Sequence, residues 1–118
     1  MVYPRVRATE AGGRVVDDPS EEAIHDLLAD LNLRHRFVIV ERCDLEPVGQ
    51  HYIQAYRNDD GSFQVEYREG SADQHYEAYF PPQPEIIGPG HLAKTMSDWA
   101  QGRHGWREAL PWAPKAMA

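Results

Sequence analysis

Three segments of apolar–polar alternation, joined by two glycine-containing turns, constrain this chain more than any other feature. The segments span residues 51–57, 62–69 and 74–80. In the middle segment, Phe63, Val65 and Tyr67 alternate with polar side chains. Successive side chains of a strand point to opposite faces of a sheet. The pattern therefore predicts an antiparallel meander with one apolar face and one face open to water.

Upstream of the meander, the sequence predicts a hairpin and one further strand. Residues 2–9 alternate, and residues 14–17 return after a turn that contains two glycines. This spacing is typical of a β-hairpin. Residues 37–40 are continuously apolar and include β-branched side chains. We interpret them as a central strand covered on both faces.

One amphipathic helix is predicted before the meander and one after it. The first follows Asp18, which can cap it, with Pro19 at the first helical position and Glu21 completing a capping box. Its apolar stripe consists of Ile24, Leu27, Leu28 and Leu31. The second helix spans about residues 90–100, and its stripe consists of Leu92, Met96 and Trp99. Both stripes need a sheet to cover them, because one helix cannot bury such a stripe alone.

Together these elements predict a single α+β domain. We expect an antiparallel sheet of five to six strands, made by the N-terminal hairpin and the C-terminal meander, with two helices packed on one face. A chain of 118 residues is the usual size of one domain. The domain is expected to comprise residues 1–118, with a tail that frays after about residue 114.

Composition and charge narrow the classes of function. The net charge is −7, which disfavours direct binding of nucleic acid because an acidic protein repels phosphates. Between residues 37 and 80, nine carboxylates stand against three arginines. This region is either an ordinary solvated surface or an acidic face that attracts a basic partner. No apolar run approaches the roughly 20 residues needed to span a bilayer, and no signal peptide is visible, so we expect a cytoplasmic protein without membrane contact.

The sequence contains no recognisable active site, so we expect a protein that is not an enzyme and needs no cofactor. His75 and Glu77 match the H-x-E half of a zinc deaminase signature, but the P-C-x-x-C half is absent and Cys43 is the one cysteine. On a strand these two side chains share a face without any metal. No local signature supports a catalytic Cys43 with His51 or His75 as base, and a free cysteine is more often an inert small apolar side chain. We predict no metal at His75 and Glu77 and no catalytic residue.

The wet face of the meander is the predicted partner-binding surface. If Phe63, Val65 and Tyr67 face the core, the residues between them must face outward. The predicted partner-binding residues are Gln64, Glu66, Arg68, His75, Glu77 and Tyr79. Because both helices are needed on the apolar face, we expect nothing in the chain to cover this one.

Trp106 and Trp112 form a second candidate for partner binding. They either close the end of the core, because tryptophan buries a large surface, or they anchor an interface, where tryptophan is enriched.

Five short motifs follow one another along the second two thirds of the chain. They are FVIVER at residues 37–42, YIQA at 52–55, VEYREG at 65–70, HYEA at 75–78 and WREALPW at 106–112. In these motifs the chain resembles the immunity proteins of bacterial polymorphic toxin systems. The nearest resemblance is to immunity protein family one, common in actinobacteria, or to a related uncharacterised actinobacterial family.

The resemblance implies a small α+β protein that binds and silences a cognate toxin domain in the producing cell. Nucleic-acid deaminases are the toxins most associated with that family, and a nuclease is the other expectation. The leading hypothesis is therefore a non-enzymatic toxin inhibitor that is a monomer or homodimer. The alternative is an accessory or small-ligand-binding protein with a pocket between sheet and helices. A neighbouring gene for a large secreted protein that ends in a toxin domain would favour the inhibitor.

Overall fold

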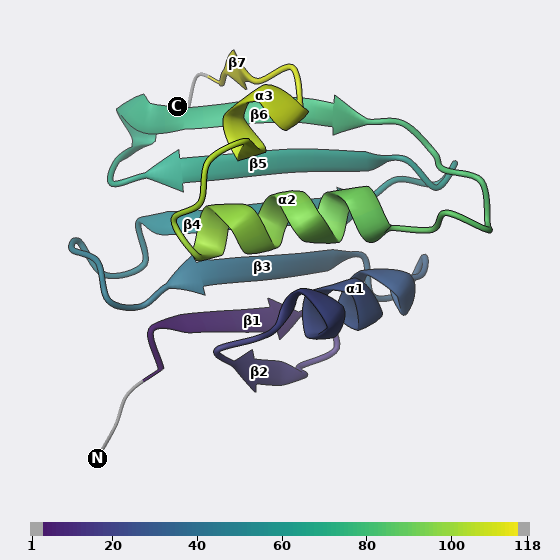
Figure 1. Cartoon of the computed structure of the whole chain (residues 1–118), viewed down its shortest axis with the longest axis horizontal. Coiled ribbons are helices and arrows are strands. Elements are labelled where there is room, and N and C mark those ends of the chain that lie inside the picture. The colour runs from purple at the N-terminus through teal and green to yellow at the C-terminus, as the bar shows by residue number, and fades with distance from the viewer. Residues whose placement is uncertain (1–3, 116–118) are drawn as a thin grey trace.

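The structure is a computed structural model that describes residues 4–115, and its centre is one antiparallel sheet (Figure 1). The strands lie in the order β2-β1-β3-β4-β5-β6-β7. Their bounds are β1 Val6–Glu10, β2 Val15–Asp17, β3 Phe37–Arg42, β4 His51–Arg57, β5 Phe63–Glu69, β6 His75–Phe80 and β7 Ala113–Pro114. The predicted α+β class and the antiparallel sheet are confirmed. The sheet has seven strands, because the two-residue β7 adds to the edge of β6.

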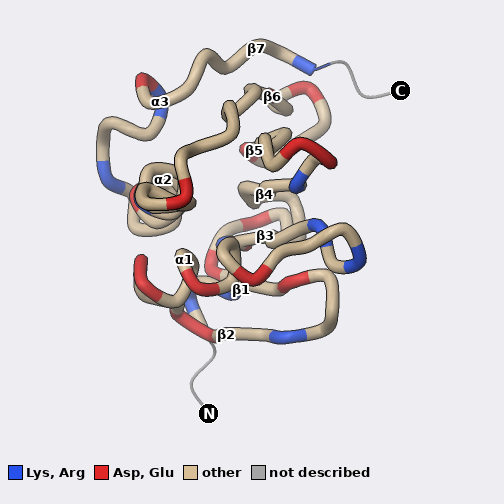
Figure 2. Tube along the Cα trace, turned by 90° about the vertical axis from the view of Figure 1, so that its right-hand side faces the viewer, with Lys and Arg blue, Asp and Glu red and all other residues tan. Residues whose placement is uncertain are grey.

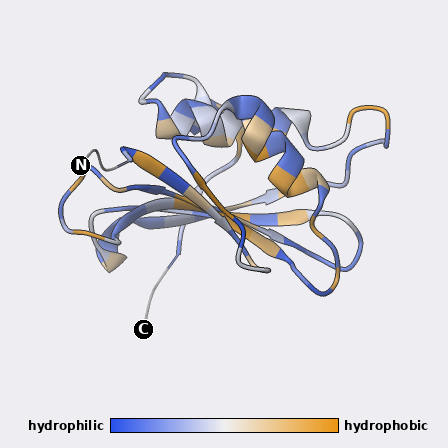
Figure 3. Ribbon diagram, turned by 90° about the horizontal axis from the view of Figure 1, so that it is seen from below, coloured by the Kyte–Doolittle hydropathy of each residue, from blue (hydrophilic) through white to orange (hydrophobic). Residues whose placement is uncertain are grey.

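All three α-helices lie on the same side of this sheet (Figures 1 and 3). They are α1 Glu21–Ala29, α2 Gly90–Ala100 and α3 Trp106–Ala109. The bounds of α2 agree with the prediction. The short α3 was not predicted, because its four residues are too few to carry a helical repeat. A single turn of 3-10 helix, Ala72–Gln74, connects β5 to β6.

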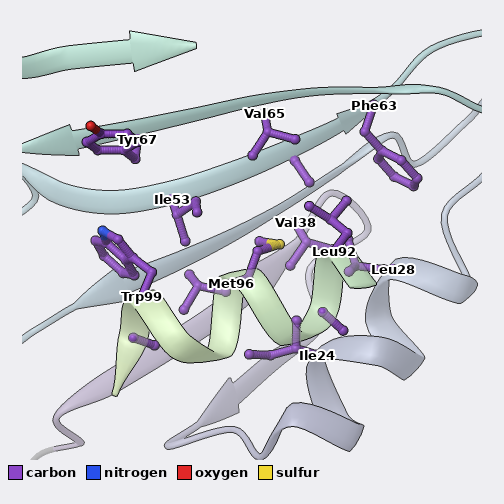
Figure 4. Close-up of a cluster of buried hydrophobic side chains, with 14 of the residues drawn as sticks. Ile24, Leu28, Val38, Ile53, Phe63, Val65, Tyr67, Leu92, Met96 and Trp99 are labelled. Carbon is purple, nitrogen blue, oxygen red and sulfur yellow. The ribbon is translucent and has the colours of Figure 1, made fainter. Parts of the chain in front are cut away.

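The hydrophobic core fills the space between the helices and the sheet (Figure 4). Its largest fully buried apolar side chains are Ile24, Ile53, Leu92, Met96, Val6, Val38, Val40 and Val65. Helix α2 lies between α1 and α3 and over the middle of the sheet (Figure 1). This central position buries even its polar residues Thr95, Ser97 and Asp98. The predicted stripe of α2 is therefore only part of what the helix buries.

The start of α1 corrects one prediction from the sequence. Ser20, not Asp18, caps the helix, and its hydroxyl oxygen accepts a hydrogen bond from the Ala23 amide at 3.1 Å. Asp18 instead has a left-handed φ of 47° and turns its carboxylate back towards β1. There one oxygen accepts the amide hydrogens of Arg5 and Val6, each at 3.0 Å. Both residue types suit an N-cap, so the local sequence alone could not separate them.

Strand β3 corrects a second prediction. Val38 and Val40 are completely buried beneath the helices, as a central strand requires. Phe37 and Ile39 point to the other side and are only half-buried. A strand of four apolar residues was expected to be covered on both faces, but no helix within residues 4–115 covers this second face.

Replacing Ser20 by alanine removes the acceptor for the Ala23 amide at the start of α1. We expect the free energy of unfolding to fall by about 1 kcal/mol, measured by urea denaturation followed by circular dichroism. Ser71→Ala is the matched control, because Ser71 precedes the 3-10 turn but its side chain makes no capping hydrogen bond. Equal losses in the two variants would contradict the assignment of Ser20 as the cap.

Candidate functional site

The face of the sheet opposite the helices is called here the open face (Figure 3). It carries the six meander residues that the sequence analysis selected, which alternate with core-facing residues along β5 and β6. The register of β5 and β6 pairs Gln64 with Tyr79, Glu66 with Glu77 and Arg68 with His75. The six residues therefore form a contiguous patch of three cross-strand pairs. Their core-facing neighbours Val65 and Ala78 are buried, as the alternation predicted.

Four residues cross the open face side by side from β3 to β6, and we call them the tyrosine row. They are Phe37, Tyr56, Gln64 and Tyr79, paired in that order by the strand register. Tyr79 and Tyr56 are exposed, with 51% and 37% of their surface open to solvent. The Arg36 guanidinium lies 5.8 Å from the centre of the Tyr56 ring. The row is thus an aromatic and amide surface held on strands.

His75 lies on the open face but does not reach solvent, because only 2% of its surface is exposed. Arg68 Nε donates to His75 Nδ1 at 3.1 Å, and His75 Nε2 lies 2.7 Å from a Glu66 carboxylate oxygen. A guanidinium can only donate, so Nδ1 must accept and Nε2 must carry the hydrogen that Glu66 accepts. The edge of His75 packs against Tyr52, and Gln50 accepts a second hydrogen bond from Arg68 at 2.8 Å. His75 therefore positions its neighbours, with Nδ1 as the acceptor and Nε2 as the donor.

The two carboxylates of the patch have a basic neighbour within the same chain. Lys115 Nζ lies 2.9 Å from Glu66 and 3.9 Å from Glu77. Burial alone would raise the pKa of Glu66, but hydrogen bonds from His75 and Lys115 outweigh it and lower that pKa below its usual value. The hydrogen bond to Glu66 raises the pKa of Lys115 in turn. Arg68 and Lys115 accompany Glu66 and Glu77 on this face, so the open face is not a simple acidic surface. Residues of both charges occur along the trace of the sheet (Figure 2).

The C-terminal segment brings Lys115 to this place by passing around the edge of β6. The two residues of β7 pair with β6, and the Lys115 amide donates to the His75 carbonyl at 2.9 Å. Trp112 just before β7 packs on the helix side of the sheet, whereas the Lys115 side chain lies on the open face. The expectation that nothing in the chain covers the open face is therefore corrected. No local pattern around Lys115 indicates this contact, which spans 49 residues.

Trp106 and Trp112 lie on the opposite side of the sheet from the meander patch. Both pack edge-on against Tyr67, with ring centres 4.8 and 4.7 Å away, and Tyr76 stacks on Tyr67 at 4.9 Å. Trp112 Nε1 donates to the Trp106 carbonyl at 3.2 Å. Trp106 is 8% exposed and belongs to the core. The two tryptophans close the end of the core, and the structure does not bring them together with the six meander residues.

Three residues of the open face were not selected from the sequence although a signal for them exists. Tyr52, Gln54 and Tyr56 alternate with the buried Ile53 and Ala55 along β4. The same two-residue period that selected the residues of β5 and β6 places them on the open face.

The side chains considered for catalysis make structural contacts within the fold. His75 binds Glu66 and not Glu77, its partner in the H-x-E motif. Within residues 4–115, no group of three or more His, Cys, Asp or Glu side chains could hold a metal ion. Burial raises the pKa of the Cys43 thiol, which reduces the fraction of reactive thiolate. The ring of His51 lies 2.9 Å from the Glu46 carbonyl and is engaged there.

The centre of the core, beneath α2, offers little room for the pocket of the alternative hypothesis, although a groove of about 400 Å³ lies between the end of α1 and the β4–β5 turn. Ile24, Ile53, Leu92 and Met96 meet between the sheet and the helices and are completely buried (Figure 4). A small ligand would have to displace this packing, whose removal costs several kcal/mol per large side chain.

Among the described residues, no helix has the length and apolar character needed to cross a membrane.

Comparison of the chain with protein-family models, with curated proteins and with solved structures found no match. Function is therefore inferred from the geometry and chemistry of the open face.

The lowered pKa of Glu66 predicts a specific loss of stability in acid. A carboxyl whose pKa is lower in the folded state stabilises the fold fully above its ordinary value of 4.5, and this stabilisation disappears as the pH falls through the lowered value. We expect the free energy of unfolding of the parent to approach that of Glu66→Gln as the pH falls through that window. Urea titrations at a series of pH values measure this difference. Glu77→Gln, which removes a carboxylate from the same face, is the control and should change the pH dependence less; a constant difference between parent and Glu66→Gln would contradict the role of Glu66.

Proposed function

We propose that this protein is a cytoplasmic, non-enzymatic domain that binds and inhibits a cognate toxin through the open face of its sheet. The observation that carries the proposal is the face itself. Within residues 4–115 it has no helix over it, and it presents exposed tyrosines beside polar groups that are already fixed in place.

The tyrosine row has the chemistry of an interface centre. Tyrosine and other aromatic residues are enriched where proteins bind proteins, because one ring contributes a large contact area and a polar group. Tyr79 and Tyr56 are exposed near one end of the strands, with Gln64 between them to donate and accept hydrogen bonds. We infer that this row, more than the carboxylates, supplies the affinity.

The polar part of the face needs little ordering on binding. Arg68 and Glu66 are both held by His75, and Lys115 is held by Glu66. Groups that are fixed before binding lose less conformational entropy when a partner arrives. This arrangement supports a rigid recognition surface, in which His75 acts through its neighbours and does not itself contact the partner.

The choice of a toxin as partner rests on two observations. The five motifs resemble immunity proteins, whose partners include nucleic-acid deaminases. A domain that acts on nucleic acid tends to be basic, and a protein with a net charge of −7 attracts such a domain over a long range. We therefore propose a deaminase or nuclease domain as the partner, with long-range attraction from the whole charge and short-range contacts from the open face.

The proposal predicts a toxin domain encoded beside this gene, and it is tested by the affinity for that domain. Tyr79→Asp places a charge at the most exposed aromatic side chain of the tyrosine row and should weaken binding by at least about tenfold, or roughly 1.4 kcal/mol. Isothermal titration calorimetry measures this loss.

Val48→Asp is the matched control, because Val48 is 71% exposed in the β3–β4 loop, at the opposite end of the strands from the tyrosine row. It should bind like the parent. If the folded Tyr79→Asp variant binds the toxin domain as tightly as the parent does, the open face is excluded as the interface. Glu66→Lys is avoided as a test, because Glu66 also holds His75 and Lys115.

A further inference from the structure

The segment of residues 81–89 between β6 and α2, called here the arm, carries the most exposed apolar side chain described. Ile86 is 95% exposed and the adjacent Ile87 is 45% exposed. Figure 3 shows this arm extending beyond the body of the molecule on the helix side, with an apolar tip. Isolated apolar residues on a surface are common, but two adjacent isoleucines at the end of a projecting segment form a knob.

The tip of the arm has a defined shape. The Pro84 carbonyl accepts hydrogen bonds from the amides of Ile87 at 2.9 Å and Gly88 at 3.0 Å, which closes a tight turn around Ile86. Four prolines restrict the backbone of the arm, at positions 81, 82, 84 and 89. An apolar knob on a stiff support loses little entropy on binding and is suited to enter a groove.

A groove with an apolar floor lies directly beside the arm. It has a volume of about 400 Å³ and runs between the arm, the end of α1 and the turn between β4 and β5. The side chains of Leu28, Leu31 and Phe63 line it. The Ile86 knob cannot fill this groove in its own chain, because the arm forms one of the groove's walls and Ile86 points into solvent.

Two charged residues at the groove complete the arrangement. Arg57 lies on the side of the β4–β5 turn, and Glu85 lies on the arm next to Ile86. Neither takes part in any ion pair formed by the part of the chain that the structure describes, residues 4–115. A chain that inserted the same arm tip into this groove would bring its own Glu85 towards Arg57.

We propose that a second copy of this chain occupies the groove, so that two copies exchange arm tips around a two-fold axis. Knob and groove lie at the same end of the molecule, so one rotation satisfies both copies and the contact closes on itself. Each Ile86 then packs on the Leu28, Leu31 and Phe63 floor of the other copy. Each Glu85 then pairs with Arg57 of the other copy.

This contact is separate from the open face and does not depend on the proposed toxin binding. Tyr79, the test residue for the open face, does not line this groove, and the arm extends on the helix side of the sheet (Figure 3). The two proposals can therefore fail independently. A membrane surface is the less favoured occupant of the apolar tip, since Glu85 stands beside it and the chain is acidic.

Sedimentation velocity over a wide range of protein concentrations tests the exchange of arms. The parent should shift from monomer to dimer as its concentration rises, whereas Ile86→Asp should remain a monomer throughout. Val48→Asp, the equivalent change at an exposed valine in the β3–β4 loop at the other end of the sheet, should dimerise like the parent. A charge exchange gives a second measurement: Arg57→Glu and Glu85→Arg should each raise the dimer dissociation constant several-fold, and the double variant should restore it.

A parent that stays monomeric at every concentration overturns the proposal, as does an Ile86→Asp variant that dimerises like the parent. If the parent is monomeric and Ile86→Asp no longer binds the toxin domain, the arm contacts the toxin and not a second copy. This result also overturns the proposal. Binding of the parent to anionic vesicles, lost in Ile86→Asp, without dimer formation would assign the tip to a membrane. Tyr79→Asp should dimerise normally whatever its affinity for the toxin domain.

Discussion

The packing of α2 against the middle of the sheet is the constraint on which the rest of the structure depends. Leu92 and Met96 are completely buried there, and α1 and α3 flank the helix so closely that Thr95 and Ser97 are buried as well. The fully buried apolar side chains of the central strands therefore point to this one side, as do those of Val38, Ile53 and Val65. A register shift of one residue would turn these side chains into water and is strongly disfavoured.

Because the helices cover only one face of the sheet, the polar groups of the other face must find their hydrogen-bond partners without them. No buried side-chain nitrogen or oxygen within residues 4–115 lacks a hydrogen-bond partner. On the open face this is achieved by a chain of contacts from Arg68 through His75 and Glu66 to Lys115. A histidine that is buried on a solvent-facing side is the result, and the surface around it is held in one arrangement. A surface that is ordered in this way loses little conformational entropy when a partner binds, which is the physical basis of the proposed recognition role.

The sequence predicted well those features that repeat at short range. The bounds of β4 and α2 agree with the alternating and helical patterns, because each pattern is local and complete. The prediction from the sequence failed where two nearby residues were chemically equivalent candidates for the same role. Asp18 and Ser20 are both good caps, and the choice depended on the amides of Arg5 and Val6, which tertiary folding brings next to Asp18.

By itself, the sequence determined which side chains share the open face and which form the core, since a two-residue period needs no knowledge of distant segments. Only the tertiary structure decided what those side chains can do. It buried His75, placed Lys115 over two carboxylates and turned Trp106 and Trp112 to the core side of the sheet. The reason is that these contacts join segments far apart in the chain, around the edge or across the thickness of one sheet, where no local pattern specifies a neighbour.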